Sequence, residues 1–496
     1  WEGRPAELYA VRPDGTEDRP LHQPGDILAA SSRGELALRL TPHPITAPQP
    51  YGTLALAQPG ASPGRPLLDN VLAAAFSPDG QQLAATQWVS EDPRGKPTWV
   101  LRYPLDRILL KSPQALTAVR VSPRGDELAV FAYDADTERG TILRVDLQGQ
   151  ARPWVKDIPT RAPGMAWMPK GDELWYSVPP EQVPHFQLWA TDRAGRQRLI
   201  RTDSTFYALH DIGPDGRCLV ERSTGRMRLM WSSAASEQDL SLWDSPSLGG
   251  LSLDGQAVLF TEAGEGAQHR EMAFYRPAPD QPPVRLGEGK GLALSPDRRW
   301  ALLVRQQQPG RPLLVPLGTG LPRELDPGLR TVENARFVPQ SDLLVVSGST
   351  KDGRSRTLLM DLRSGAAVRE LPTNGITAAD GRSLLAARDG QLMEMSLEGT
   401  ILRTFAAKLK PGSRMLSWSA DRREVYVWDA LQLPQRVHAM DLASGRERLL
   451  RTLPLRPVPG FLGIHRVLVT RDGQIVAYCL QETVMSDLLV VTFPQP

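Results

Sequence analysis

Short apolar runs alternate with polar turns along nearly the whole chain. Residues 70–76 (NVLAAAF) form one apolar run, residues 77–80 (SPDG) a polar turn, and residues 82–86 (QLAAT) a second apolar run. Short runs bounded by turn residues are typical of β-strands. In the turn, proline presets φ, aspartate bonds to nearby backbone and glycine accepts a positive φ. The pattern therefore predicts a β-hairpin.

The hairpin phrase recurs along the chain. Eleven copies, spaced 39 to 51 residues and averaging about 44, end at Gly34, Gly80, Gly125, Gly171, Gly216, Gly255, Arg298, Ser341, Gly381, Arg422 and Gly473. A period of about 40–45 residues is that of a β-propeller blade, a sheet of four strands. Where arginine or serine replaces the last glycine, we expect a different turn type or some strain.

A second phrase supplies the other half of each unit. Residues 141–155 (TILRVDLQGQARPWV) and 356–371 (RTLLMDLRSGAAVREL) each read as a strand, a glycine-containing turn and a more polar strand. Each unit is thus a four-stranded antiparallel sheet that must stack on its neighbours to bury its faces.

The number of units fixes the expected architecture. Single propellers have four to eight blades, so about 11–12 blades predict an all-β fold of tandem β-propellers, two rings of about six. Counting blades divides the chain into 1–236, a first propeller that begins within a blade, and 237–496, a second propeller. One large ring stays an alternative.

Composition limits the classes of partner. The 496 residues are 41% hydrophobic and 23% charged, the balance of a globular protein, and the net charge is only +2. So small a charge provides no field for nucleic acid or for an anionic membrane surface. The sequence contains no apolar run of membrane-spanning length and begins without the pattern of a signal peptide.

Catalytic and metal motifs find little support. Residues 60–64 (GASPG) match the spacing of a serine nucleophile elbow, but Ser62 stands where a turn between outer strands is due. The seven histidines show no metal-ligand spacing. Cys218 and Cys479 lie far apart and follow turns in apolar runs, so we expect buried strand residues rather than a disulfide. We expect no cofactor, no metal and no catalytic residue.

Four longer phrases carry a family resemblance. Residues 1–13 (WEGRPAELYAVRP), 200–220 (IRTDSTFYALHDIGPDGRCLV), 282–302 (PPVRLGEGKGLALSPDRRWAL) and 469–491 (VTRDGQIVAYCLQETVMSDLLVV) span nearly the whole chain. In these phrases the sequence resembles the WD40-like, TolB-like (PD40-type) propeller region of bacterial membrane-anchored Ser/Thr protein kinases.

The resemblance implies a setting and a role. In that family a kinase domain and one membrane helix precede the propeller, which would place this segment in the periplasm or outside the cell. The kinase motifs themselves do not occur here. The implied role is therefore that of a non-enzymatic sensor or interaction module, which an upstream helix would tether to the membrane.

Ring geometry suggests where a ligand would bind. The first strand of each blade lines the central channel, so residues about five to seven positions before each turn gather at one rim. These candidates are Asn70, Arg161, Tyr207, Lys290, Glu333, Asn334, Arg414 and His465. Arg161 and Tyr207 would face one channel, and Lys290, Glu333, Arg414 and His465 the other. Mixed charge of this kind can hold a zwitterion or a peptide terminus.

Three functional hypotheses follow. The leading one is a sensor or interaction module that binds a protein, peptide or small molecule at a rim. An alternative of another class is a propeller enzyme, such as a lyase, lactonase or glycosidase, whose residues come from several blades and leave no local motif. A third is a TolB-like scaffold of the cell envelope.

Overall fold

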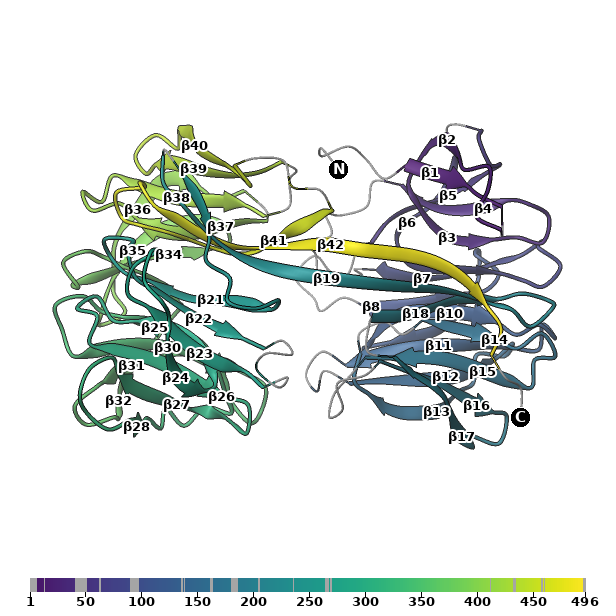
Figure 1. Cartoon of the computed structure of the whole chain (residues 1–496), viewed down its shortest axis with the longest axis horizontal. Helices are drawn as coiled ribbons and strands as arrows, with labels where there is room; N and C mark the ends of the chain where they lie inside the picture. Colours follow the sequence, from purple (N-terminus) through teal and green to yellow (C-terminus); the bar gives the residue numbers. More distant parts are fainter. Residues whose placement is uncertain are drawn as a thin grey trace. The chain divides into compact units, whose positions relative to one another are not determined.

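The structure, a computed structural model, describes residues 7–493 except 13, 41–50, 62–63, 90–97, 135–136, 138, 161–163, 180–185, 204–205, 235, 264–266, 268–269, 411, 431–433, 456–457 and 459. Its elements are antiparallel β-strands, most of which pair with their neighbours in sequence (Figure 1). The predicted all-β propeller fold is confirmed. Within the described part of the chain, no helical segment has the length and apolar character that crossing a bilayer requires.

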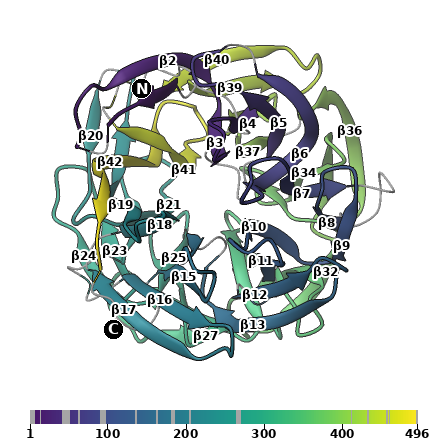
Figure 2. The ribbon, with the colours of Figure 1, turned by 90° about the vertical axis from the view of Figure 1, so that its right-hand side faces the viewer.

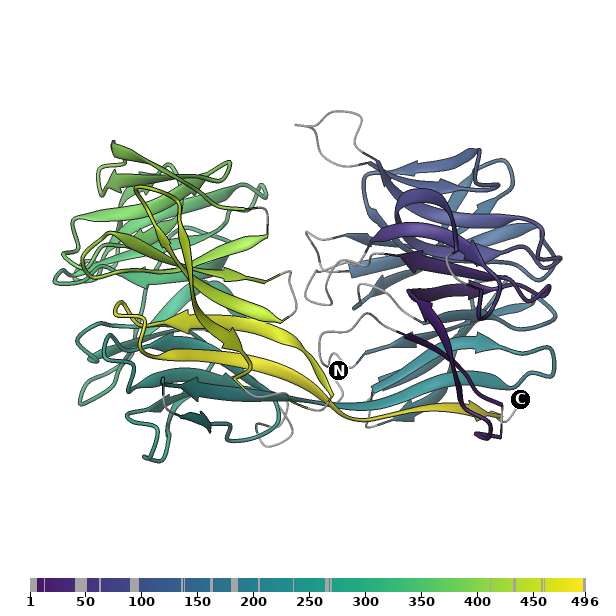
Figure 3. The same cartoon turned by 90° about the horizontal axis from the view of Figure 1, so that it is seen from above.

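The chain forms two compact units. The first unit comprises Gly3–Gly225 and Thr483–Pro496, and the second unit contains Arg226–Glu482. This division differs from the boundary expected between residues 236 and 237. Its two crossing points lie inside strands β19 (Cys218–Ser232) and β42 (Val476–Val491), which pair with each other (Figures 1 and 3). Counting repeats assigns a contiguous stretch to each ring and cannot reveal that two long strands, β19 and β42, each take part in both units.

In the first unit the sheets follow one another along the chain. Figure 2 shows these sheets, from purple to teal, arranged around a centre. The sheet orders are β1-β2, β3-β4-β5-β6-β7-β8-β9, β10-β11-β12-β13 and β14-β15-β16-β17; then β18 pairs with the first half of β19, next to β42. The strands are β1 (Glu7–Ala10), β2 (Arg19–Pro24), β3 (Asp26–Ala30), β4 (Leu36–Leu40), β5 (Gly52–Ala57), β6 (Arg65–Phe76), β7 (Leu83–Val89), β8 (Thr98–Arg102), β9 (Ile108–Ser112), β10 (Ala115–Val121), β11 (Glu127–Asp134), β12 (Arg139–Asp146), β13 (Ala151–Ile158), β14 (Met165–Trp167), β15 (Glu173–Val178), β16 (Phe186–Asp192), β17 (Gln197–Asp203) and β18 (Phe206–Ile212).

In the second unit five sheets of four consecutive strands precede a composite sixth. The composite sheet joins β41, the first half of β42, the second half of β19 and β20. The strands are β20 (Glu237–Asp239), β21 (Pro246–Leu251), β22 (Val258–Glu262), β23 (Met272–Arg276), β24 (Val284–Glu288), β25 (Lys290–Leu294), β26 (Trp300–Arg305), β27 (Gln308–Pro316), β28 (Arg323–Glu324), β29 (Thr331–Phe337), β30 (Leu343–Ser349), β31 (Ser355–Asp361), β32 (Ala367–Leu371), β33 (Gly375–Thr377), β34 (Ser383–Arg388), β35 (Gln391–Ser396), β36 (Ile401–Lys408), β37 (Ser413–Trp418), β38 (Glu424–Asp429), β39 (Gln435–Asp441), β40 (Glu447–Leu453) and β41 (Phe461–Val469).

The first strands of these six sheets form a closed cycle, and we call them the inner strands. Strand β21 contacts β25, β25 contacts β29, and the series continues through β33, β37 and β41 back to β21. The ring therefore closes through a sheet whose two inner positions come from the end of the unit and whose two outer positions come from its start.

The core lies between successive sheets. Leu302 and Leu314 of the β25–β28 blade pack against Leu344 and Met360 of the β29–β32 blade, and each of these four side chains is at most 1% exposed. Burial of one such side chain contributes about 1.5–3 kcal/mol. Since each blade has an apolar neighbour on both sides, its central strands read as continuous apolar runs.

The recurring turn is held by side chains as well as by backbone. Gly80 N donates to Ser77 O over 2.8 Å, and Ser77 Oγ donates to Asp79 Oδ1 over 2.5 Å while accepting from Gln82 N over 2.9 Å. The same serine-to-aspartate bond recurs at Ser252–Asp254, Ser295–Asp297 and Ser419–Asp421. The first serine of the phrase thus bonds to both the aspartate and the start of the second strand.

Copies without the last glycine show both expected outcomes. Arg298 and Arg422 keep the ordinary turn with φ of 56° and 62°, a region that strains a side chain. In the remaining copy without the last glycine, which ends at Ser341, the positive φ of 55° falls on Gln340 instead. Both arginines form ion pairs with the preceding blade, Arg298 with Asp254 and Arg422 with Glu394.

Both cysteines are free and buried, as expected from their positions in apolar runs. Burial raises the pKa of the Cys218 thiol to about 11 and that of Cys479 to about 12.

Candidate functional site

Most of the sequence candidates lie on first strands of sheets. Asn70 is in β6, Tyr207 in β18, Lys290 in β25, Glu333 and Asn334 in β29, Arg414 in β37, and His465 in β41. Arg161 and the serine of the possible nucleophile elbow, Ser62, lie outside the described residues.

Asn70 lies where strand β6 exchanges one partner strand for the next within a single sheet. Strand β6 pairs with β5 from Arg65 to Val71, with an irregular register between Leu68 and Val71, and with β7 from Val71 onward. In this irregular stretch Asn70 adopts a φ of 58°. Asparagine tolerates this left-handed conformation better than most residues, so its placement has a conformational explanation.

Tyr207 lies in the core of the first unit instead of on an open rim. Its side chain is 6% exposed, its ring centroid is 6.4 Å from that of Phe493, and the guanidinium of Arg201 lies 5.9 Å from its centroid. Burial raises the pKa of the Tyr207 hydroxyl to about 12. The apolar surroundings of β18 account for this position.

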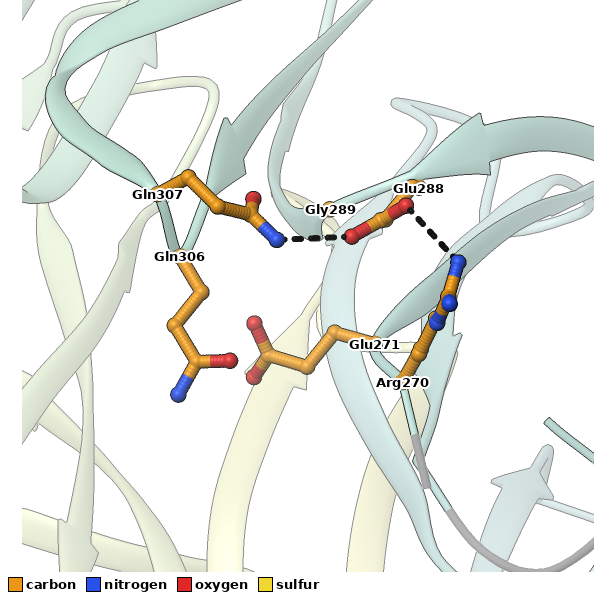
Figure 4. A pocket seen from close by; sticks show the side chains of 6 residues that line it. All are labelled: Arg270, Glu271, Glu288, Gly289, Gln306 and Gln307. Atoms are coloured by element: carbon orange, nitrogen blue, oxygen red, sulfur yellow. Dashed lines mark hydrogen bonds and ion pairs between the residues drawn. The ribbon is translucent and has the colours of Figure 1, made fainter. Parts of the chain in front are cut away.

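Lys290 is exposed beside a small polar cavity of the second unit. Arg270, Glu271, Glu288, Gly289, Gln306 and Gln307 line this cavity, whose volume is about 260 Å³. In Figure 4 the side chains of Glu271 and Gln306 point toward each other, while Gln307 donates to Glu288 over 3.0 Å and Arg270 lies 3.8 Å from Glu288. Burial raises the pKa of Glu271, and the charge of Lys290 partly opposes this shift.

Glu333 and Asn334 line a larger cavity, which we call the β29 cavity. Its volume is about 820 Å³, and Ser347, Ser355, Arg356, Thr357, Glu370, Leu371, Pro372, Thr373 and Asn374 complete its lining. Thr331 Oγ1 donates to Glu333 over 3.1 Å, and the Ser347 and Thr357 hydroxyls lie 3.1 Å apart. Arg356 pairs with Glu370 over 3.3 Å. The cavity thus offers hydroxyl, amide and paired charged groups.

Arg414 and His465 contact neighbours within their own sheets. The guanidinium of Arg414 lies 5.7 Å from the ring centroid of Trp428, and His465 Nε2 lies 2.7 Å from Gln481 Oε1. Both side chains are exposed. The structure therefore brings Glu333 and Asn334 together in one cavity. Arg414 and His465, in contrast, each contact a separate partner in their own sheet.

The candidate list omitted most of the β29 cavity because it considered only inner strands. Arg356 and Glu370 come from the third and fourth strands of the blade, and their sequence signal is the ordinary polarity of outer strands. Asn374 could have been found. It lies seven positions before Gly381, the offset of Asn334 from Ser341.

The described residues contain no group of three or more histidine, cysteine, aspartate or glutamate side chains placed to hold a metal ion.

Comparisons with known proteins return structures but no sequence family. No protein-family profile matches the chain, and no curated protein sequence matches it. Among solved structures, TolB from Acinetobacter baumannii is 12% identical, with 64% of this chain and 78% of that chain covered and a TM-score of 0.26. The WD40 β-propeller domain of Doa1 is 12% identical over 63% and 89%, with a TM-score of 0.31. The β-propeller domain of the trilobed protease from Pyrococcus furiosus is 12% identical over 58% and 92%, with a TM-score of 0.24.

Proposed function

We propose that this chain is a non-enzymatic interaction module, and that its second unit binds a polypeptide segment in the β29 cavity. The observation that carries the proposal is the lining of this cavity. It combines hydroxyl groups, the Asn334 and Asn374 amides and the Arg356–Glu370 pair next to an inner strand.

The chemistry of the lining suits a peptide. Backbone amides need both donors and acceptors, which serine, threonine and asparagine side chains provide. A free chain end carries a full charge, and either member of the Arg356–Glu370 pair can exchange its partner for it. The volume of about 820 Å³ falls in the range of about 300–1,000 Å³ typical of ligand pockets.

A filled-cavity variant tests this proposal. Peptides with free ends are screened on the intact chain, and the affinity of those that bind is measured by fluorescence anisotropy. Asn334→Trp should weaken binding by about tenfold or more, as expected from steric exclusion and lost hydrogen bonds. The matched control Val368→Trp, on the exposed outer strand β32 of the same blade, should leave binding unchanged. Equal affinity of Asn334→Trp and the unchanged chain would overturn the assignment.

The sensor role and its setting rest on the sequence resemblance to the propeller region of membrane-anchored Ser/Thr kinases. In this setting the chain lies outside the cytoplasm, and ligand binding alters a kinase across the membrane. Intact mass and peptide mapping of the native polypeptide in its source cells test the context. A kinase domain and a membrane helix ahead of Trp1 support it, while a mature chain that starts near Trp1 contradicts it.

A second candidate, a propeller hydrolase, is favoured by the small polar cavity that Glu271 and Glu288 line. A carboxyl group with a raised pKa near a second, ion-paired carboxylate resembles the division between acid and base in glycosidases. The test is a panel of chromogenic glycosides and lactones. Turnover that Glu271→Gln abolishes and Glu398→Gln preserves would support an enzyme, and absence of turnover on the whole panel would favour the interaction module.

A further inference from the structure

Three arginines of the second unit lie on or beside its inner strands. Arg336 is near the end of β29, Arg466 is in β41, and Arg471 is in the turn that follows β41. In the cycle β21, β25, β29, β33, β37, β41, strands β29 and β41 are three steps apart. Arg336 and Arg466 thus belong to opposite walls of a six-membered ring.

The contacts of two of these arginines indicate that they reach inward. Arg466 Nη2 donates to Gly249 O of β21 over 3.3 Å. Arg471 Nη2 donates to Thr377 O over 2.8 Å and lies 3.4 Å from both Thr377 Oγ1 and Ala378 O. Thr377 ends β33, so the Arg471 side chain passes the intervening β37–β40 blade. Both guanidinium groups bond to neutral oxygen atoms, which leave their charge unbalanced.

Arg336 has no neutralising partner at all in the described part of the chain. No hydrogen bond or ion pair joins it to a described residue, and its Nε atom is buried without a partner, as is Nη1 of Arg471. Burial and the charges of Arg466 and Arg471 lower the pKa of Arg336 to about 10. The carboxylate that acts on Arg471, Asp380, already lies 3.5 Å from Arg422.

All three side chains are half-buried, and cations of one sign held partly out of water are costly unless an anion accompanies them. Guanidinium groups match oxyanions because their planar N–H forks bond two oxygen atoms at once. We infer that Arg336, Arg466 and Arg471 form a binding site for a small oxyanion, the carboxylate or phosphate group of a ligand, at the centre of the second unit. This site uses none of the residues of the β29 cavity and goes beyond the function proposed above.

The experiment is isothermal titration calorimetry of the whole chain with inorganic phosphate and, separately, with citrate at constant ionic strength. We expect one saturable site per chain for at least one probe. Saturation by phosphate alone identifies a phosphate ligand, and saturation by citrate alone a carboxylate ligand. Arg336→Met should weaken binding by about tenfold or more, as loss of a charged hydrogen-bond donor predicts. Arg388→Met is the matched control, because Arg388 is an exposed arginine of β34 outside the cluster, and this variant should bind like the unchanged chain.

Two results would overturn the inference. One is the absence of saturable binding of either probe to the unchanged chain, and the other is equal affinity of Arg336→Met and the unchanged chain. If Arg336→Met does not fold, Arg336→Lys replaces it, since lysine keeps the charge and removes the fork. A tenfold loss is then still expected for a site that uses bidentate geometry, and unaltered binding would contradict it.

Discussion

The hydroxyl group of Tyr478 donates a hydrogen bond to the carboxylate of Glu237, 241 residues away in the sequence. Tyr478 belongs to the first half of β42 and Glu237 begins β20, so this bond joins the last strand of the second unit to a strand near its start, within the sheet that closes its ring. Glu237 also accepts from Leu455 N over 3.3 Å. The Tyr478 side chain is 0% exposed, and burial raises the pKa of its hydroxyl, which therefore stays protonated as the donor.

Tyr478→Phe should lower the free energy of unfolding of the second unit by about 1–3 kcal/mol, the value of a buried hydrogen bond to a charged group. Urea unfolding followed by circular dichroism measures this change. Tyr275→Phe is the matched control, because Tyr275 is only partly buried and no hydrogen bond joins its hydroxyl to a described residue. A Tyr478→Phe chain as stable as the control would show that the bond does not contribute to closure.

Phe493→Ala should destabilise the first unit. The Phe493 ring is 7% exposed and lies 5.9 Å from Trp175 and 6.4 Å from Tyr207, centroid to centroid. Truncating a buried phenylalanine to alanine costs about 3–5 kcal/mol. Hydrogen exchange measured by mass spectrometry should speed up in β18 and the first half of β19. It should not change in β29–β32.

Val484→Ala provides the control for this prediction, since Val484 is in the same C-terminal segment, Thr483–Pro496, but is 62% exposed. If Phe493→Ala left exchange in β18 unaltered, the C-terminal segment would not stabilise the first unit.

The sequence predicted the blades well because their signal is local. The Ser122–Gly125 turn, the apolar runs on both sides of it and the Asp-Leu turn at Asp146 recur with the blade period, and all three lie within the β10–β13 sheet. The division between units was not predicted as accurately. It depends on the pairing of β19 with β42, which are more than 240 residues apart, and no local pattern encodes such a long-range partner.

The position of a candidate residue could be predicted only where it depends on its own strand and not on a distant segment. Glu333 and Asn334 line a cavity because an inner strand enters the ring there. Tyr207 satisfied the same spacing rule, yet Phe493 covers it from a segment far along the chain. The arginines at 336 and 466 interrupt apolar inner strands, and only ring closure brings opposite walls into electrostatic contact.

Glu262→Gln should remove a pH dependence of stability. Glu262 is 0% exposed, its Oε1 accepts from the backbone of Leu242 and Trp243, and its Oε2 has no partner among described residues. Burial raises the pKa of this carboxyl above the unfolded value of 4.5. The folded chain thus holds this proton more tightly than the unfolded chain does. The resulting contribution to the free energy of unfolding is complete below pH 4.5 and is lost as pH rises through the folded pKa.

Urea unfolding between weakly acidic and neutral pH measures this difference. As pH rises, the unchanged chain should lose stability relative to Glu262→Gln by at most about 1.4 kcal/mol per pH unit. Glu398→Gln should follow the unchanged chain over this range, because a hydrogen bond from Ser396 lowers the pKa of that carboxyl, and its contribution to stability changes only as pH falls below the ordinary value of 4.5. Parallel curves for the unchanged chain and Glu262→Gln would contradict the expected protonation of Glu262.

Arg298→Gly and Arg422→Gly should have different effects although both relieve a positive φ. Arg298 pairs with Asp254, whose side chain is 53% exposed, and an exposed pair contributes at most about 1 kcal/mol. Its replacement should leave stability within about 0.5 kcal/mol, because the relieved left-handed strain offsets the loss. Arg422 pairs over 3.1 Å with Glu394, which is 5% exposed.

Arg422→Gly should therefore lower the free energy of unfolding by about 1–3 kcal/mol, since a buried carboxylate loses one of its partners while Arg403 remains 2.7 Å away. Thermal and urea unfolding of both variants provide the comparison. Equal effects of the two substitutions would mean that the conformation of the turn, and not the ion pair, determines the outcome.

The split of the first unit between Gly3–Gly225 and Thr483–Pro496 has a consequence for biosynthesis. A ribosome must translate the whole of Arg226–Glu482 before it reaches the strand that covers β18 and β19. During that interval the edge of β19 remains unpaired and the apolar surface around Tyr207 remains uncovered. Unpaired strand edges of this kind are prone to aggregation. The second unit has all its own strands by then, so it can finish folding before the unit that was begun first.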